Sequence, residues 1–165
     1  MARTPTDTAP NPWAAAAAGL VAGLAASLAM DLFQAGVAAL SSSESDAEPA
    51  TQKAADKVSK AVAGHAISDD RKPLAGQVVH YALGAGLGIA YAVAAEYRPA
   101  VTAGYGTAFA AVTTSLLDEA AVPAAGLGEA PWNTAPTTHL YSAASHIVFG
   151  TVTEGVRRFL LGWLK

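Results

Sequence analysis

The chain has 165 residues, of which 52% are hydrophobic and only 14% are charged, whereas about 25% are charged in a typical soluble domain. The net charge is −3 and no basic run occurs, so composition gives no reason to expect a nucleic-acid partner. The absence of cysteine excludes disulfides, thiolate metal sites and cysteine nucleophiles.

The N-terminal part combines a polar tail with a long apolar stretch. Residues 1–12 are polar and contain three prolines, and we expect a disordered tail there. Residues 13–40 are apolar except for three side chains, Ser27, Asp31 and Gln34. This stretch is long enough to cross a bilayer, which needs about 20 residues. A signal peptide is the competing interpretation, but its positive segment would rest on Arg3 alone, and its apolar core would be only about 7–15 residues long.

A polar connection follows over residues 41–73. Its first part, residues 41–49, is acidic and turn-like. Residues 50–67 predict a short helix with apolar side chains on one side and its lysines mostly elsewhere. Two interpretations stay open, because such a helix can lie on a membrane surface or be solvated within a loop.

Three further apolar stretches span about residues 74–96, 101–122 and 138–163. The first two are joined by a very short link, which predicts an antiparallel hairpin. Aromatic residues mark the expected helix ends, as in an interfacial belt: Trp13, Tyr97, Trp132 and Trp163. The sequence therefore predicts an all-α protein, an integral membrane four-helix bundle over residues 13–165 with both termini on one side. A soluble bundle is the alternative, but its helices would normally carry a charged face.

Two of these stretches carry similar stripes that end in an acid. The stripes are Gly19, Gly23, Ser27, Asp31 and Gly106, Ala110, Thr114, Asp118. A step of four residues keeps each stripe along one face of a helix. A carboxylate within a membrane-spanning segment is costly and marks a functional site by default.

Counting along the helices places most ionisable side chains in one half of the membrane. Asp31 lies about 27 Å along its helix from Trp13 at about 1.5 Å per residue, toward the side opposite the termini. The second and fourth helices enter from that side with His80 and His146. The same half holds Gln34, Asp118, Glu119 and His139.

A carboxylate stripe followed by a histidine occurs twice. This order predicts two parallel helical hairpins related by a pseudo-two-fold axis along the membrane normal. Asp31 and His80 of one hairpin would then face Asp118 and His146 of the other. Glu119 points about 100° away from Asp118 around the helix.

Three interpretations of this cluster stay open. It binds a divalent metal ion, with Asp118, His80 and His146 as ligands. It handles protons or ions, since histidine titrates near neutral pH. Or the Asp/His pairs only hydrogen-bond across helices and stabilise their packing. Glu119 and His139 are further candidates for ion or proton binding, although His139 near the surface is also explained as an interfacial side chain.

Enzymatic motifs are absent from the sequence. We find no nucleophile elbow, phosphate-binding loop, dinucleotide fingerprint or metalloprotease motif, so we assign no catalytic residue and do not expect an enzyme. A membrane enzyme with a His/carboxylate metal centre is the remaining catalytic alternative. The divalent ion is the only cofactor considered, and a lipid bilayer is the expected surrounding. Five glycines favour close packing within the bundle: Gly19, Gly23, Gly84, Gly86 and Gly88. A homo-oligomer or a membrane-complex partner is the alternative role of these residues.

Two segments resemble a known family. Residues 80–99, HYALGAGLGIAYAVAAEYRP, resemble the second-helix signature of the YagU-like family of small bacterial inner-membrane proteins. Residues 145–150, SHIVFG, followed by Arg157 and Arg158, resemble its later part. The likeness covers about residues 75–160. The resemblance implies an uncharacterised integral inner-membrane protein, with one relative linked to acid resistance, and brings no catalytic residues.

Orientation rests on the positions of the basic residues. Arg98, Arg157 and Arg158 lie close to predicted helix ends, where positive charges weigh most in the positive-inside rule. We therefore expect a multi-pass protein of the bacterial inner (cytoplasmic) membrane with both termini in the cytoplasm. The Asp/His cluster would then open toward the periplasm.

Overall fold

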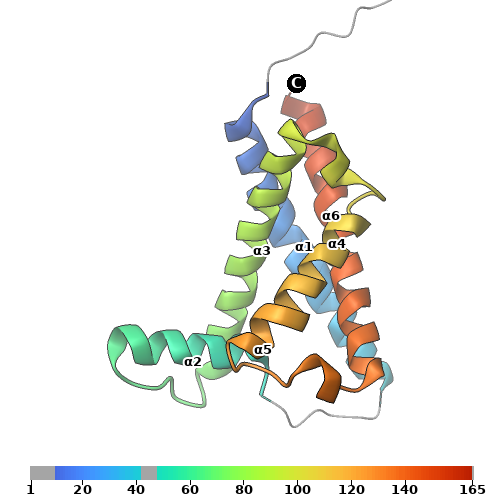
Figure 1. Cartoon of the computed structure of the whole chain (residues 1–165). Coiled ribbons are helices and arrows are strands. Elements are labelled where there is room, and N and C mark those ends of the chain that lie inside the picture. Colours follow the sequence, from blue (N-terminus) through green and yellow to red (C-terminus); the bar gives the residue numbers. More distant parts are fainter. Residues whose placement is uncertain (1–9, 42–47, 165) are drawn as a thin grey trace, which may run out of the picture.

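The computed structural model describes residues 10–41 and 48–164, and within these ranges every regular element is a helix (Figure 1). The elements in chain order are α1 Pro12–Leu40, α2 Ala50–Ala63, α3 Lys72–Tyr97, η1 Pro99–Thr102, α4 Thr107–Thr113, η2 Thr114–Ala121, α5 Val122–Ala124, η3 Pro131–Asn133 and α6 Pro136–Leu164. The all-α prediction is confirmed. Most of the tail expected at residues 1–12 lies outside the described residues.

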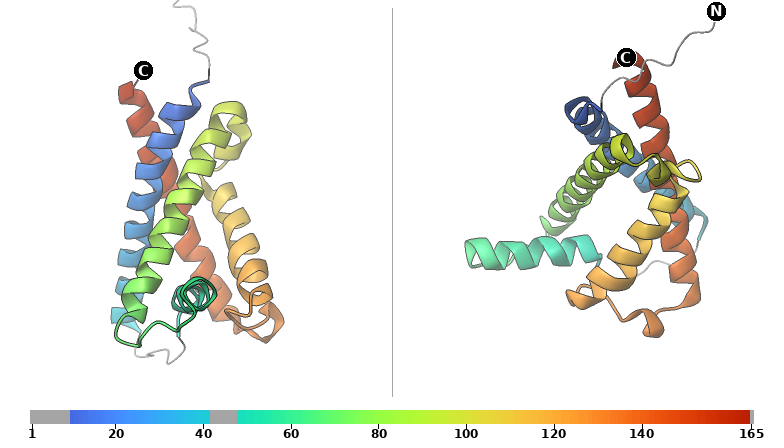
Figure 2. Two further views of the ribbon diagram at one scale, coloured as in Figure 1. Left: turned by 90° about the vertical axis from the view of Figure 1, so that its left-hand side faces the viewer. Right: turned by 45° about the horizontal axis from the view of Figure 1, so that its top comes forward.

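Three long helices form the body of the molecule. α1 packs along both α3 and α6, and α4 packs against α6 (Figures 1 and 2). α1 begins with a side-chain cap, because the Ala14 amide donates to the Asn11 side chain at 3.0 Å. The start of α1 and the end of α6 lie at the same end of the bundle (Figure 1).

Glycine allows the closest helix contacts. A Cβ added at Gly23 would overlap the carbonyl oxygen of Gly84, and one at Gly19 would overlap that of Gly88. The same close approach recurs between α4 and α6, where Gly106 meets Gly150. Small residues let helix backbones come this near to each other, so the small members of both stripes serve helix packing.

The third apolar stretch differs from the single helix expected at residues 101–122. It opens with the 3-10 helix η1 and a tight turn in which Gly104, Tyr105 and Gly106 have positive φ, a conformation that cannot continue a right-handed helix. The helix that follows widens into the π-helix η2. Thr113 and Thr114 both donate their hydroxyls to the Ala110 carbonyl at 2.9 Å, and such bonds compete with the regular backbone ladder.

α2 lies crosswise to the long helices, at the end of the bundle opposite the termini (Figures 1 and 2). Its first turn packs on the start of α3, where a Cβ at Gly76 would meet the Gln52 side chain. The rest of α2 extends away from the bundle. The short helix expected at residues 50–67 is thus present as Ala50–Ala63, and it ends at Gly64 in the left-handed conformation.

Large apolar side chains lie on the outside of the bundle. Small residues fill much of the interior along α1, and one apolar cluster combines Ala26, Met30 and Phe149. Outside, Leu28 and Phe159 are 51% and 62% exposed. By length and composition, two of the described helices, α1 and α3, could cross a membrane.

Candidate functional site

The first Asp/His pair joins α1 to α3. His80 Nε2 lies 3.2 Å from Asp31 Oδ1, and Gln77 Nε2 donates to Asp31 Oδ2 at 2.5 Å. Gln77 and His80 are three residues apart, so one face of α3 presents both to α1. His80 Nε2 also lies 3.4 Å from the Ser27 carbonyl oxygen, one turn before Asp31. The Asp31 carboxylate is therefore held by two side chains of the neighbouring helix.

The second pair joins η2 to α6 in a similar way. His146 Nδ1 lies 3.5 Å from Asp118 Oδ2, and the Ser142 hydroxyl donates to the same carboxylate. His146 Nδ1 also lies 3.1 Å from the Ser142 carbonyl oxygen. Asp118 comes from the π-helical segment, an element that often occurs at functional sites.

The tautomer of each histidine follows from its partners. A carbonyl oxygen only accepts hydrogen bonds, so the ring nitrogen that faces it carries the hydrogen. This assigns the N–H to Nε2 of His80 and to Nδ1 of His146. The opposite nitrogen of each ring is then the one that can accept a proton or bind a metal ion.

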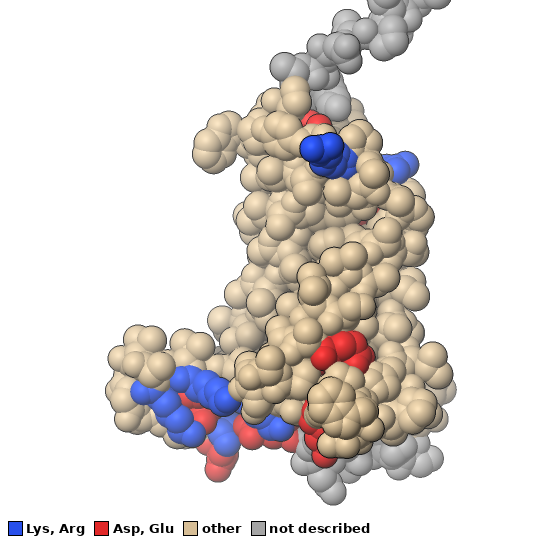
Figure 3. Space-filling view, in the orientation of Figure 1, with Lys and Arg blue, Asp and Glu red and all other residues tan. Residues whose placement is uncertain are grey.

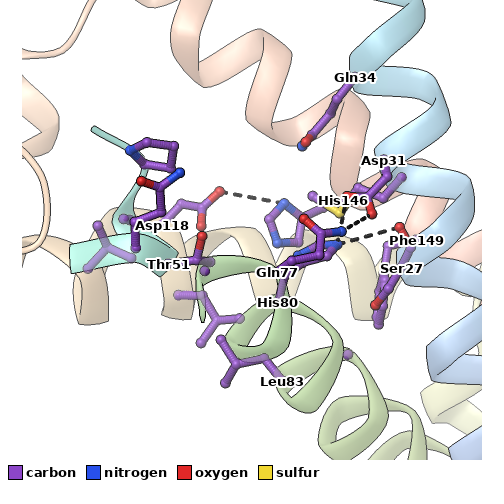
Figure 4. Close-up of a pocket in the computed structure, with 18 of the residues that line it drawn as sticks. Ser27, Asp31, Gln34, Thr51, Gln77, His80, Leu83, Asp118, His146 and Phe149 are labelled. Atoms are coloured by element: carbon purple, nitrogen blue, oxygen red, sulfur yellow. Dashed lines mark hydrogen bonds and ion pairs between the residues drawn. The ribbon is translucent and has the colours of Figure 1, made fainter. Parts of the chain in front are cut away.

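Both pairs line one cavity of about 420 Å³ between the two halves of the bundle (Figure 4). Its polar lining includes Ser27, Asp31, Gln34, Gln77, His80, Asp118 and His146. Apolar side chains line the rest, among them Met30, Leu83, Leu87 and Phe149. The first turn of α2, residues 49–52, forms one wall.

An apolar cluster lies next to this cavity on the side toward the termini. Met30 and Phe149 belong both to the cavity wall and to the cluster with Ala26. Leu87, Phe109 and Val152 pack against that cluster. Because α6 continues from His146 through Phe149 toward the termini (Figure 1), the ionisable side chains lie at one end of the bundle and apolar packing follows them.

Glu119 and His139 form a separate pair. Glu119 Oε1 lies 2.6 Å from His139 Nδ1, and the other ring nitrogen lies 3.1 Å from the Pro131 carbonyl oxygen. Neither residue is among those that line the cavity. The structure thus divides the six candidates into four at the cavity and two near the loop that precedes α6.

Within the described residues, no three His, Asp or Glu side chains gather closely enough to hold a metal ion. The three proposed ligands belong to different pairs: His80 lies with Asp31, and Asp118 lies with His146. The geometry therefore shows two Asp/His pairs at one cavity, and the assignment of a metal remains a proposal.

An ion cluster that the sequence did not predict lies at the opposite end of the bundle. Glu154 is 0% exposed and accepts from Arg157 at 2.7 and 3.1 Å, from Arg158 at 2.5 Å and from the Tyr91 hydroxyl at 2.9 Å. These arginines had the appearance of ordinary helix-end charges. The available signal was the three- and four-residue spacing from Glu154, which places both arginines beside that acid on a helix.

The fold defines an all-helical protein in which two long helices are apolar enough to span a membrane. The chain belongs to a family described as a protein of unknown function (DUF1440), whose model matches residues 43–155. The matched range contains His80, Asp118 and His146, whereas α1 with Asp31 precedes it. No curated protein and no solved structure matches the chain.

Proposed function

We propose that the protein is a four-helix protein of the bacterial inner membrane, crossed by α1, α3, the segment from α4 to α5, and α6. The exposed apolar side chains on the bundle flank support this placement, since a soluble bundle would leave them in water. On the face in Figure 3, a broad band without charged side chains separates the arginines at one end from the charged residues around α2 at the other. Both termini would lie in the cytoplasm.

We further propose that the cavity binds and releases protons through its two Asp/His pairs. The observation that carries this proposal is that Asp31–His80 and Asp118–His146 line the same cavity. In each pair the carboxylate lies beside the imidazole and would stabilise the positive charge that forms when the free ring nitrogen takes a proton. The apolar cluster beside the cavity favours proton exchange with one side of the membrane only. Such a site suits a role in acid or ion stress.

The competing explanation is purely structural. Each Asp/His pair connects two helices, α1 with α3 and η2 with α6, so hydrogen bonds of this kind contribute to packing without any chemistry. A divalent metal at the cavity is the other outcome to be distinguished.

The test measures the titration of the histidines in the reconstituted protein. With ¹⁵N-labelled histidine in lipid nanodiscs, we expect His80 and His146 to take up a proton reversibly in the folded protein. Asp31→Asn and Asp118→Asn should each weaken proton uptake at the paired histidine, because the neutral amide no longer stabilises the imidazolium.

The control is Glu119→Gln, which should shift His139 and leave the two cavity histidines unchanged. Histidines that stay neutral down to pH 4 in folded protein would refute the proton proposal and leave the structural explanation. Metal analysis of the same preparations provides the third arm. Stoichiometric metal in the wild type that is lost in Asp118→Asn and His146→Ala would replace the proton proposal with a metal site.

A further inference from the structure

α2 projects sideways from the end of the bundle that holds the cavity. It has 14 residues, its first turn contacts the start of α3 through Gln52 and Gly76, and Ala55 in the next turn is buried. A tether holds it at the level of α5, where the Lys57 ammonium donates to the Ala125 carbonyl at 2.5 Å. If the long helices cross a bilayer, α2 lies in the plane of the membrane surface (Figures 1 and 2).

One side of α2 is apolar and uncovered. Val58 and Val62 are 61% and 84% exposed, and Ala54 and Ala61 complete the same side by their three- and four-residue spacing. The chain that returns to α3 covers another side: the Asp56 carboxylate accepts the Ile67 amide at 2.8 Å, and the Ser59 hydroxyl donates to the His65 carbonyl. This returning chain passes beneath α2 in Figure 1, which leaves the apolar side open toward the flank of the bundle.

The charged side chains of α2 are separated from this apolar side. The helix carries three lysines and one aspartate, Lys53, Lys57, Lys60 and Asp56. In Figure 3 the charges lie along the front and lower side of α2, while its upper side, along the bundle flank, shows none. A short helix with valines on one side, lysines beside them and a low overall hydrophobicity has the composition of an interfacial helix.

We propose that α2 docks on the lipid surface of the leaflet at the cavity end, with its valines among the upper acyl chains and its positively charged side facing anionic headgroups. The three lysines of α2 outnumber its one aspartate, and this excess of positive charge favours an anionic lipid surface over a second protein. This inference rests on the membrane placement proposed above for the long helices.

Docking would also position a wall of the cavity. Residues 49–52 both begin α2 and line the cavity, and Gln52 is packed against α3 at Gly76. A helix held at the headgroups therefore keeps its first turn beside the two Asp/His pairs. The lipid surface and the cavity are coupled through one short helix.

Single-cysteine spin labels test the proposal in the full-length protein, because the chain has no cysteine of its own. Val58→Cys and Val62→Cys report the apolar side of α2, and Asp70→Cys in the following turn is the water reference. Leu28→Cys on the flank of α1 is the lipid reference. Each labelled protein is placed in nanodiscs of phosphatidylcholine with and without phosphatidylglycerol, and collisions with oxygen and with a water-soluble nickel complex are measured.

We expect labels at Val58 and Val62 to collide several-fold more often with oxygen than with the nickel complex in anionic nanodiscs, relative to the label at Asp70. In phosphatidylcholine alone, or after Lys53→Gln, this preference should fall toward that of Asp70.

The remaining outcomes separate the two proposals. A lipid-exposed label at Leu28 together with water-exposed labels at Val58 and Val62 would refute docking and leave the membrane placement intact. A water-exposed label at Leu28 would refute the membrane placement itself. Strong spin–spin broadening between copies at Val62 would show that a second copy of the chain covers this side, which would overturn lipid docking.

Discussion

At the scale of single residues, the buried Glu154 accepts hydrogen bonds from three side chains. Two arginines and a tyrosine on two helices share one carboxylate. A buried carboxylate with several charged donors is stabilising only while the set is complete, because removal of one partner leaves an uncompensated charge. The cluster therefore fixes how the ends of α3 and α6 meet.

We predict that Glu154→Gln lowers the free energy of unfolding by about 3–5 kcal/mol, the usual cost of breaking a buried ion pair from one side. Arg157→Gln should cost more than Arg158→Gln, since the Arg157 side chain is 12% exposed and that of Arg158 is 53% exposed. Thermal unfolding in detergent measures both effects. Equal melting temperatures for the two arginine variants would contradict this ranking, and Glu129→Gln, at an exposed position in the loop before α6, serves as the control.

A second residue-scale prediction concerns Asp56, in the polar connection. The hydrogen bond from Lys60, followed by that from the Ile67 amide, lowers the pKa of Asp56 below its ordinary value of 3.8. Because the folded pKa is depressed, the stability contributed by these bonds is present above pH 3.8 and is lost as the pH falls through the lowered pKa.

Amide hydrogen exchange tests this pH dependence. The Ile67 amide should stay protected at neutral pH and lose protection only below about pH 3.8, while Asp56→Asn should reduce its protection at neutral pH. Protection that is equal in both proteins across this range would show that the Asp56 bond does not hold the turn.

At the scale of elements, the glycines of α3 are not equivalent. Gly88 lies against the backbone of α1 at Gly19 and Gly23, whereas nothing lies within 4 Å of a Cβ added at Gly86. By sequence, both glycines are among the small residues expected to favour close packing. Their separation by two residues places them on different sides of the helix, and only the three-dimensional packing shows which side is occupied.

We predict opposite effects for two matched substitutions on α3. Gly88→Ala should destabilise the α1–α3 contact, because the added methyl group overlaps the α1 backbone. Gly86→Ala should be neutral or stabilising by up to about 1 kcal/mol, since alanine is the better helix former. Melting temperatures in one detergent compare them, and a loss of stability in Gly86→Ala equal to that in Gly88→Ala would contradict the assigned packing.

Element prediction succeeded where hydrophobicity alone sets the structure. The apolar stretches correspond to α1, α3 and α6, whereas α2 ends at Ala63, before the expected boundary at residue 67. The third stretch was less predictable, because its turn depends on positive φ at a non-glycine residue, Tyr105. The π-helix depends on hydroxyl groups that compete for one carbonyl oxygen, and hydropathy contains no signal for this competition.

At the scale of the whole molecule, the two ends of the bundle hold different kinds of ionisable groups. One end holds the complete ion cluster around Glu154, and the other holds Asp/His pairs around a cavity. Counting along the helices could place Asp31 and Asp118 at the same depth, because helical rise is constant. The angle of about 100° between Asp118 and Glu119 already indicated different sides of the helix, whereas the pairing of Glu119 with His139 depends on how η2 and α6 face each other.

The π-helix also has a consequence for how this family can change by insertion and deletion. A π-helical turn closes with i→i+5 bonds and contains one residue more than the α-helical turn it replaces. Since α4 is anchored to α6 where Gly106 meets Gly150, loss of one residue from η2 before Asp118 would return this turn to α-helical geometry and keep the residues that follow on the same face. Asp118 would then still face His146, so the π-helical turn allows the chain length to vary by one residue here while the acid that faces this histidine is kept.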